Sequence, residues 1–96
     1  MKSYAWEEGN LLGNYLYYDK KTGEIIGEVS RIGMTGTRTS ASSYMDRKLT
    51  VYLGNYIDSK YAKKAVEEHT DWCDRMVEGH FLESWKNYYV FYAYCY

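Results

Sequence analysis

The stretch from Leu49 to Val77 constrains the fold most, because its pattern changes from the period of a strand to the period of a helix. Leu49, Val51 and Leu53 alternate with Thr50, Tyr52 and Gly54, as in a half-buried strand. After Gly54 and Asn55, residues typical of a helix core face recur at steps of three and four: Ala62, Ala65, Val66, His69, Trp72, Cys73, Met76 and Val77. The stretch therefore predicts a strand, a tight turn at Gly54 and Asn55, and a long amphipathic helix whose apolar stripe is core.

Both ends of this helix carry stop signals. Asp58 or Ser59 can cap the N-terminus by accepting hydrogen bonds from free backbone N–H groups. With Asp58 as the cap, Ile57 and Ala62 occupy the positions of a hydrophobic staple. Gly79 follows the last periodic residue and favours a left-handed C-terminal stop.

The rest of the chain predicts a single domain, 1–96, around that unit. Asn14 to Asp19 and Glu24 to Ile32 are rich in strand formers and flank the turn KKTG, which predicts a hairpin. We expect an α+β fold over 14–78: a three-stranded antiparallel sheet packed on one long α-helix. Residues 33–46 predict a flexible or binding loop. Residues 80–96 form a C-terminal extension whose uncharged segment from Tyr88 to Tyr96 reads as an aromatic strand.

Composition limits the classes of partner. The 96-residue chain has a net charge of −1, which argues against a protein that binds polyanions by bulk charge. Residues 14–64 hold nine Lys and Arg against five Asp and Glu, whereas residues 66–96 are acidic. Thirteen tyrosines exceed what a small core hides, and Tyr suits half-wet contact surfaces. Two cysteines, a polar N-terminus and the lack of a membrane-length apolar run predict a cytoplasmic protein, in the host cytoplasm if phage-encoded.

Catalytic chemistry is weakly represented, and we expect neither an enzyme nor a cofactor. His69 and Cys73 lie one helical turn apart, but both fall on the apolar stripe and a zinc site needs more ligands. Core packing is the expected role of this pair, and no metal site is predicted. The acidic residues of the helix form a solvated face: Glu67, Glu68, Asp71, Asp74 and Glu78.

Two segments carry a resemblance to a known family. TGEIIGEVSR, from Thr22 to Arg31, and VYLGNYIDSKYAKKAVE, from Val51 to Glu67, resemble the Apetala-type domain of plant ethylene-response factors and the related integrase-type DNA-binding domains. The matching positions in the strand are Gly23, Ile25, Gly27, Glu28 and Val29. Those in the turn and helix are Val51, Tyr52, Leu53, Gly54, Tyr56, Asp58 or Ser59, Ala62 and Ala65. The resemblance covers about half of the chain and implies three strands followed by a helix.

The resemblance also implies DNA binding, because the outer sheet face of those domains enters the major groove. Three positions keep a comparable character: Glu28, Tyr52 and Lys20. Four positions lack the Arg that is usual in the family: Tyr15, Tyr18, Ser30 and Thr50. The loss of four cations removes most of the phosphate-neutralising charge. The long loop and the C-terminal segment also lie outside the family pattern.

Two functions therefore remain open. The first is binding of DNA or RNA through the sheet face and its basic rim, with Tyr rings stacking on unpaired bases. The second is a phage-type accessory or inhibitor protein that binds a larger host protein through Tyr-rich surfaces. The candidate binding residues are Tyr15, Tyr18, Lys20, Lys21, Glu28, Ser30, Arg31, Arg38, Arg47, Lys48, Thr50 and Tyr52. A candidate patch for self-association or a partner is Tyr88, Tyr92 and Tyr94, on the outward side of the C-terminal segment; no membrane contact is expected.

Overall fold

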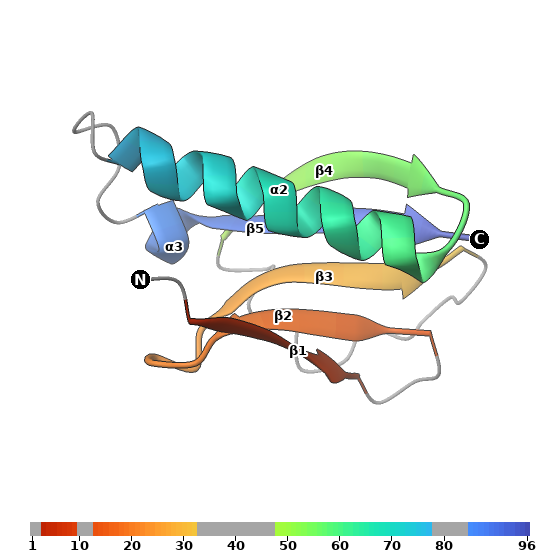
Figure 1. Ribbon diagram of the computed structural model, residues 1–96, viewed down its shortest axis with the longest axis horizontal. Coiled ribbons are helices and arrows are strands. Elements are labelled where there is room, and N and C mark those ends of the chain that lie inside the picture. The colour runs from red at the N-terminus through yellow and green to blue at the C-terminus, as the bar shows by residue number, and fades with distance from the viewer. Residues whose placement is uncertain (1–2, 10–12, 33–47, 78–84) are drawn as a thin grey trace.

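The computed structural model of the chain is a five-stranded mixed sheet with one long helix across one face (Figure 1). The structure describes residues 3–9, 13–32, 48–77 and 85–96. The strands are β1 (Tyr4–Glu8), β2 (Tyr15–Asp19), β3 (Ile25–Arg31), β4 (Leu49–Tyr56) and β5 (Tyr89–Cys95). The helices are α2 (Ser59–Val77) and the short α3 (Trp85–Tyr88), which leads directly into β5.

The strand order is β1-β2-β3-β5-β4, so the expected three-stranded antiparallel sheet is wrong. β1, β2 and β3 are antiparallel, but β4 does not pair with β3. β5 lies between them and runs parallel to both. Its sequence, YVFYAYC, has no charged residue, and its side chains are mostly buried on both faces, as expected of a central parallel strand. Residues 89–95 of the supposed C-terminal extension thus form an interior strand of the sheet, between β3 and β4.

The unit β4–α2–β5 is a parallel crossover in which the helix returns the chain to the neighbouring strand. The capping prediction is confirmed, because the backbone N–H of Tyr61 donates to Asp58 Oδ1 at 3.3 Å. The turn, however, is not at Gly54 and Asn55. β4 continues to Tyr56, and Gly54, with a φ of 133°, lies where the β4–β5 register shifts.

α2 packs closely on the central strands. Ala62, Val66 and Thr70 are buried on its inner face. A side chain at Gly27 of β3 would lie 2.6 Å from Val66 Cγ1, so the glycine allows the helix and sheet to approach. Phe91 of β5 stacks on Trp85 and meets His69 edge-on, with ring centroids 5.3 Å and 4.4 Å apart. This layer is the main core.

The N-terminal residues form a strand, β1, that was not among the predicted elements. β1 pairs along β2, and Trp6 lies against Tyr17 with ring centroids 4.6 Å apart. The Trp6 Nε1–H donates to Glu67 of α2 at 2.7 Å. The hairpin between β2 and β3 is confirmed: Asp19 and Glu24 close its loop by a backbone hydrogen bond, and Gly23 has a φ of 76°.

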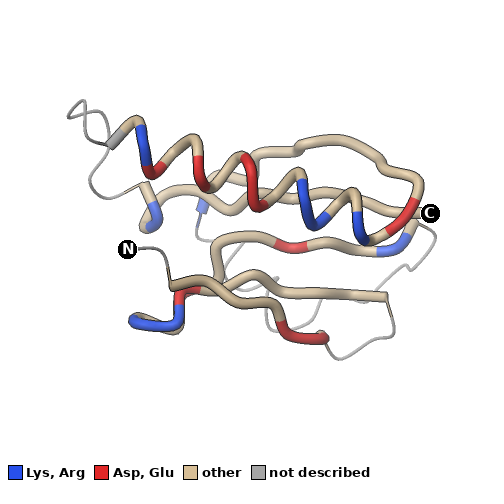
Figure 2. Tube along the Cα trace, in the orientation of Figure 1, with Lys and Arg blue, Asp and Glu red and all other residues tan. Residues whose placement is uncertain are grey.

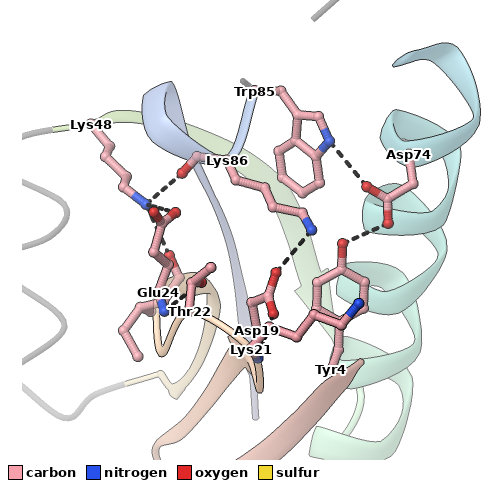
Figure 3. A network of polar contacts seen from close by, with 10 residues as sticks. Tyr4, Asp19, Lys21, Thr22, Glu24, Lys48, Asp74, Trp85 and Lys86 are labelled. Carbon is pink, nitrogen blue, oxygen red and sulfur yellow. Dashed lines mark hydrogen bonds and ion pairs between the residues drawn. The ribbon is translucent and has the colours of Figure 1, made fainter. Parts of the chain in front are cut away.

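A network of polar contacts ties the hairpin loop to the far end of α2 and to α3 (Figure 3). Asp74 accepts hydrogen bonds from Tyr4 Oη at 2.6 Å and from Trp85 Nε1 at 3.1 Å. The Lys86 ammonium donates to Asp19 Oδ2 at 2.9 Å. Burial, and then the hydrogen bond and charge of Asp74, raise the pKa of Tyr4. The network fixes α3 and thereby the start of β5.

Candidate binding surface

The structure divides the predicted sheet residues between the two faces of the sheet. Side chains alternate along a strand, and Phe91 contacts α2, so Val90, Tyr92 and Tyr94 point to the helix-free face. The register places five predicted residues on this same face: Tyr18, Glu28, Ser30, Thr50 and Tyr52. Tyr15 lies on the helix side instead, where the Lys63 ammonium sits 3.7 Å from its ring centroid.

Much of the helix-free face is buried, which was not predicted. Glu28 is 1 % exposed and accepts a hydrogen bond from Ser30 Oγ at 2.9 Å. Tyr92 is 5 % exposed. Burial raises the pKa of its hydroxyl to about 12; the hydrogen bond with Tyr94 and the charge of Glu28 act in the same direction, and the hydrogen bond with Ser30 acts to lower it. Tyr94 is half-buried, with its ring centroid 6.0 Å from that of Tyr52. Tyr52 and Thr50 are the predicted residues of this face that are exposed in the described part of the chain.

The predicted basic rim does not form one patch among the described residues. Lys20 and Lys21 lie in the β2–β3 loop, whereas Arg31 ends β3 at the opposite end of the sheet (Figure 2). Lys48 is engaged: its ammonium donates to the carbonyls of Ile25 and Lys86 and lies 3.7 Å from Glu24. Burial lowers the pKa of Lys48, although Glu24 opposes this shift. Arg38 and Arg47, with the predicted loop 33–46, lie outside the described residues.

The C-terminal tyrosines do not form a common outward row. The segment is a strand, as predicted, and its inner set of Phe91, Ala93 and Cys95 is buried. Tyr92 is buried too, and Tyr88 is exposed at the end of α3 instead of in the strand. β5 is hydrogen-bonded to a strand on each side, so its backbone is not available to add to another sheet.

Six of the nine large apolar side chains that are exposed in the described part of the chain lie along β4, the turn after it and α2. We call this surface the β4–α2 flank and define it by its exposed and groove-lining residues: Leu49, Tyr52, Leu53, Tyr56 and Ile57 from β4 and its turn, and Tyr61, Ala65, Glu68, His69, Trp72 and Met76 from α2. Trp72 is 48 % exposed and Leu49 is 65 % exposed. The prediction that the whole apolar stripe of α2 is core is therefore wrong for Trp72 and Met76.

A shallow groove of about 430 Å³ runs between α2 and β4 on this flank. Leu53 and Tyr56 of β4 line it together with Ala65, Glu68, His69 and Trp72 of α2. The ring of Trp72 is supported by the core, because it stacks on His69, and the His69 ring contacts Phe91 edge-on. Burial lowers the pKa of His69, so this imidazole is neutral at pH 7. The groove thus presents an aromatic wall and the side chain of one acidic residue, Glu68.

The backbone of β4 also faces outward on this flank. β4 ends the strand order and pairs with β5 alone among the described strands. Its eight residues, LTVYLGNY, include no charged residue and no proline, two of the usual protections of an edge strand; its protection is the register shift between Tyr52 and Gly54. The opposite edge, β1, has five residues and carries exposed Glu7 and Glu8. The two edges of the sheet therefore differ in how well they are guarded.

Chemical groups suited to catalysis are sparse in the described part of the chain. His69 and Cys73 are half-buried, and burial followed by the charge of Asp74 raises the pKa of Cys73 to about 11. The thiol is therefore protonated at neutral pH. The described residues include no group of three or more His, Cys, Asp or Glu side chains arranged to hold a metal ion.

Comparison with known proteins gives no relative: no family model, curated protein or solved structure matches the chain. The described helices include none that is long and apolar enough to cross a membrane. The β4–α2 flank is thus defined by its own geometry. The sequence carried two signals for it, a charge-free β4 and an apolar stripe on α2 wider than one buried face.

Proposed function

We propose that the protein is a small non-catalytic binding module that docks on a larger protein through the β4–α2 flank. The observation that supports this function is the concentration of large exposed side chains beside an open groove. Trp and Tyr are enriched among residues that dominate binding energy, and exposed apolar patches mark interaction sites. Trp72 has the features of an anchor, since its ring is held by His69 before any partner arrives.

Photo-crosslinking tests this proposal directly. A photoreactive amino acid replaces Tyr61 or Trp72 on the flank, or Glu8 on β1 as the control, in cells that naturally produce the protein. We expect the two flank positions to capture the same protein and Glu8 to capture none of it. Equal products at all three positions, or products that nuclease digests, would contradict a protein-binding flank.

Nucleic-acid binding is the second candidate. The observation that favours it is the ring of Tyr52, 56 % exposed on the helix-free face beside Tyr94, because an aromatic ring can stack on an unpaired base. Against it, Glu28 lies on the same face, while Lys48 is held by Glu24. Phosphate contacts dominate such affinity, so this arrangement favours the protein partner.

A titration with single-stranded DNA and RNA at several salt concentrations tests the second candidate. Nucleic-acid binding predicts an affinity that falls steeply with salt and is reduced by Tyr52→Ser. Tyr61→Ser is the matched control, because it removes an exposed tyrosine from α2. Absence of binding at low salt would remove this candidate.

A further inference from the structure

We propose that the occupant of the β4–α2 flank is an extended segment of another protein, which adds as a strand to the outer edge of β4. The segment alternates apolar side chains toward the groove and carries one basic side chain for Glu68. This inference rests on the proposed function and deepens it by naming the chemistry of the partner.

The edge of β4 supplies the backbone part of this recognition. An edge strand presents unpaired N–H and C=O groups, and strand addition satisfies them in a new ladder. β4 is eight residues long and uncharged, so neither length nor charge prevents a strand from pairing; the ladder is interrupted at Leu53, whose carbonyl accepts from Tyr56 Oη at 3.1 Å where the register shifts. β1 at the other edge has five residues, so it offers a shorter ladder than β4.

The groove supplies the side-chain part. Alternate side chains of an added strand point to opposite faces of the sheet. Those on the α2 side enter the groove, where Leu53, Tyr56 and Trp72 favour apolar groups. Those on the other side lie next to Tyr52, which is exposed at the same edge. The segment therefore needs apolar residues at every second position.

Charge decides between another protein and a second copy of this chain. Glu68 is the carboxylate among the described residues that line the groove, and His69 beside it is neutral at pH 7. Glu67 and Asp71 do not line this groove: Glu67 accepts from Trp6, and Asp71 lies 3.3 Å from the Arg75 guanidinium. Lys60 and Lys64 lie toward the N-terminus of α2 (Figure 2). The β4 of a second copy has no basic residue to meet Glu68. A partner strand with Lys or Arg fits the groove better.

Selection from a random linear peptide library displayed on phage tests the inference, with the full chain immobilised. We expect enriched peptides to alternate apolar and polar residues and to share a Lys or Arg. When the Glu68→Lys variant is immobilised instead, the enriched peptides should share an Asp or Glu in place of the Lys or Arg. The Glu7→Lys variant of β1 should keep the basic preference, because Glu7 lies on the opposite edge. Circular dichroism checks that both variants fold.

The best peptide is then synthesised, with its basic residue present or reversed. Glu68→Lys should weaken the binding of the peptide with the basic residue by about tenfold, and the peptide with the reversed charge should regain that affinity. Two further peptides carry N-methyl groups on the odd or on the even backbone amides. One of the two should fail to bind, because its methyl groups replace the N–H donors that face β4. A peptide that tolerates methylation in both registers would overturn strand addition.

Other outcomes also overturn the inference. They are a selection that enriches no peptide, a motif without a basic residue, or dimers of the free chain that Leu49→Lys dissociates in light scattering. If a photoreactive residue at position 61 or 72 still crosslinks to a protein in cells, the proposed function survives and the strand-like occupant alone is wrong. If crosslinking fails as well, the flank is not a binding surface.

Discussion

The ion pair between Asp19 and Lys86 links pH to stability at the scale of single residues. Burial acts to raise the pKa of Asp19, but the Lys86 ammonium and the Lys21 backbone N–H outweigh it, so the pKa lies below the ordinary 3.8. A carboxyl with a lowered folded-state pKa stabilises the fold above its unfolded pKa, and this stabilisation is lost as the pH falls. The hydrogen bond, 2.9 Å long, is therefore strongest near neutral pH.

We predict that Lys86→Met lowers the free energy of unfolding by about 1–2 kcal/mol at pH 7. The difference in unfolding free energy between the two proteins should narrow as the pH falls below about 5. It should close only below the lowered folded-state pKa of Asp19, where this carboxyl is neutral in both proteins. Urea unfolding at pH 7, 5 and 3 measures this. Lys20→Met, in the exposed turn, is the control and should show no such convergence. A difference that stays constant with pH would refute the linkage.

Asp74 carries a second prediction at this scale. Its carboxylate accepts from Tyr4 and from the indole of Trp85, which is 1 % exposed. Asp74→Ala leaves that indole N–H buried without its acceptor, which costs about 1–3 kcal/mol of stability. Arg75→Ala, on an exposed side chain one residue away, should change stability by at most about 0.5 kcal/mol. Equal melting temperatures for the two variants would show that the network contributes little.

At the scale of elements, the contact between Gly27 and Val66 sets the distance between β3 and α2. A methyl group at position 27 would lie 2.6 Å from Val66 Cγ1 and 3.0 Å from the Phe91 carbonyl oxygen. Gly27→Ala should therefore lower stability by about 1–3 kcal/mol through overpacking. Adding Val66→Ala should relieve part of this loss, so the double-mutant cycle should give a favourable coupling energy. Additive effects would mean that the helix shifts away freely.

Local patterns identified the elements whose stabilising contacts are local. The cap at Asp58, the long helix and the β2–β3 hairpin each depend on residues a few positions apart. The inner face of α2 was predicted only in part. Ala62 and Val66 of the predicted stripe are buried, whereas Trp72 and Met76 of the same stripe are exposed, and periodicity does not show which part of a wide stripe meets the sheet. That choice depends on strands far away in the sequence.

At the scale of the whole molecule, β5 explains why the predicted topology and site were wrong. An uncharged aromatic segment indicates burial, but its pairing partners are set by contacts between distant residues. Because β5 lies between β3 and β4, the buried Tyr92 separates Glu28 from Tyr52 on the predicted binding face. The same placement leaves β4 at the edge and so creates the β4–α2 flank. The candidate surface therefore follows from strand order, which single-sequence patterns do not contain.

The central position of β5 makes the fold depend on the last residues of the chain. Without residues 89–96, β3 and β4 lose their shared neighbour, and Val66 and His69 lose Phe91 as a packing partner. We predict that this truncation abolishes cooperative unfolding in urea, because β4 and α2 no longer join the β1–β3 sheet through a strand. Tyr96→Ala is the control: this side chain is 67 % exposed, and the variant keeps the backbone that bonds to Tyr56, so it should unfold cooperatively near the wild-type midpoint. A truncated protein with a sharp transition and dispersed amide resonances would show that β5 is an accessory strand, and that the two halves of the sheet are held together by other contacts.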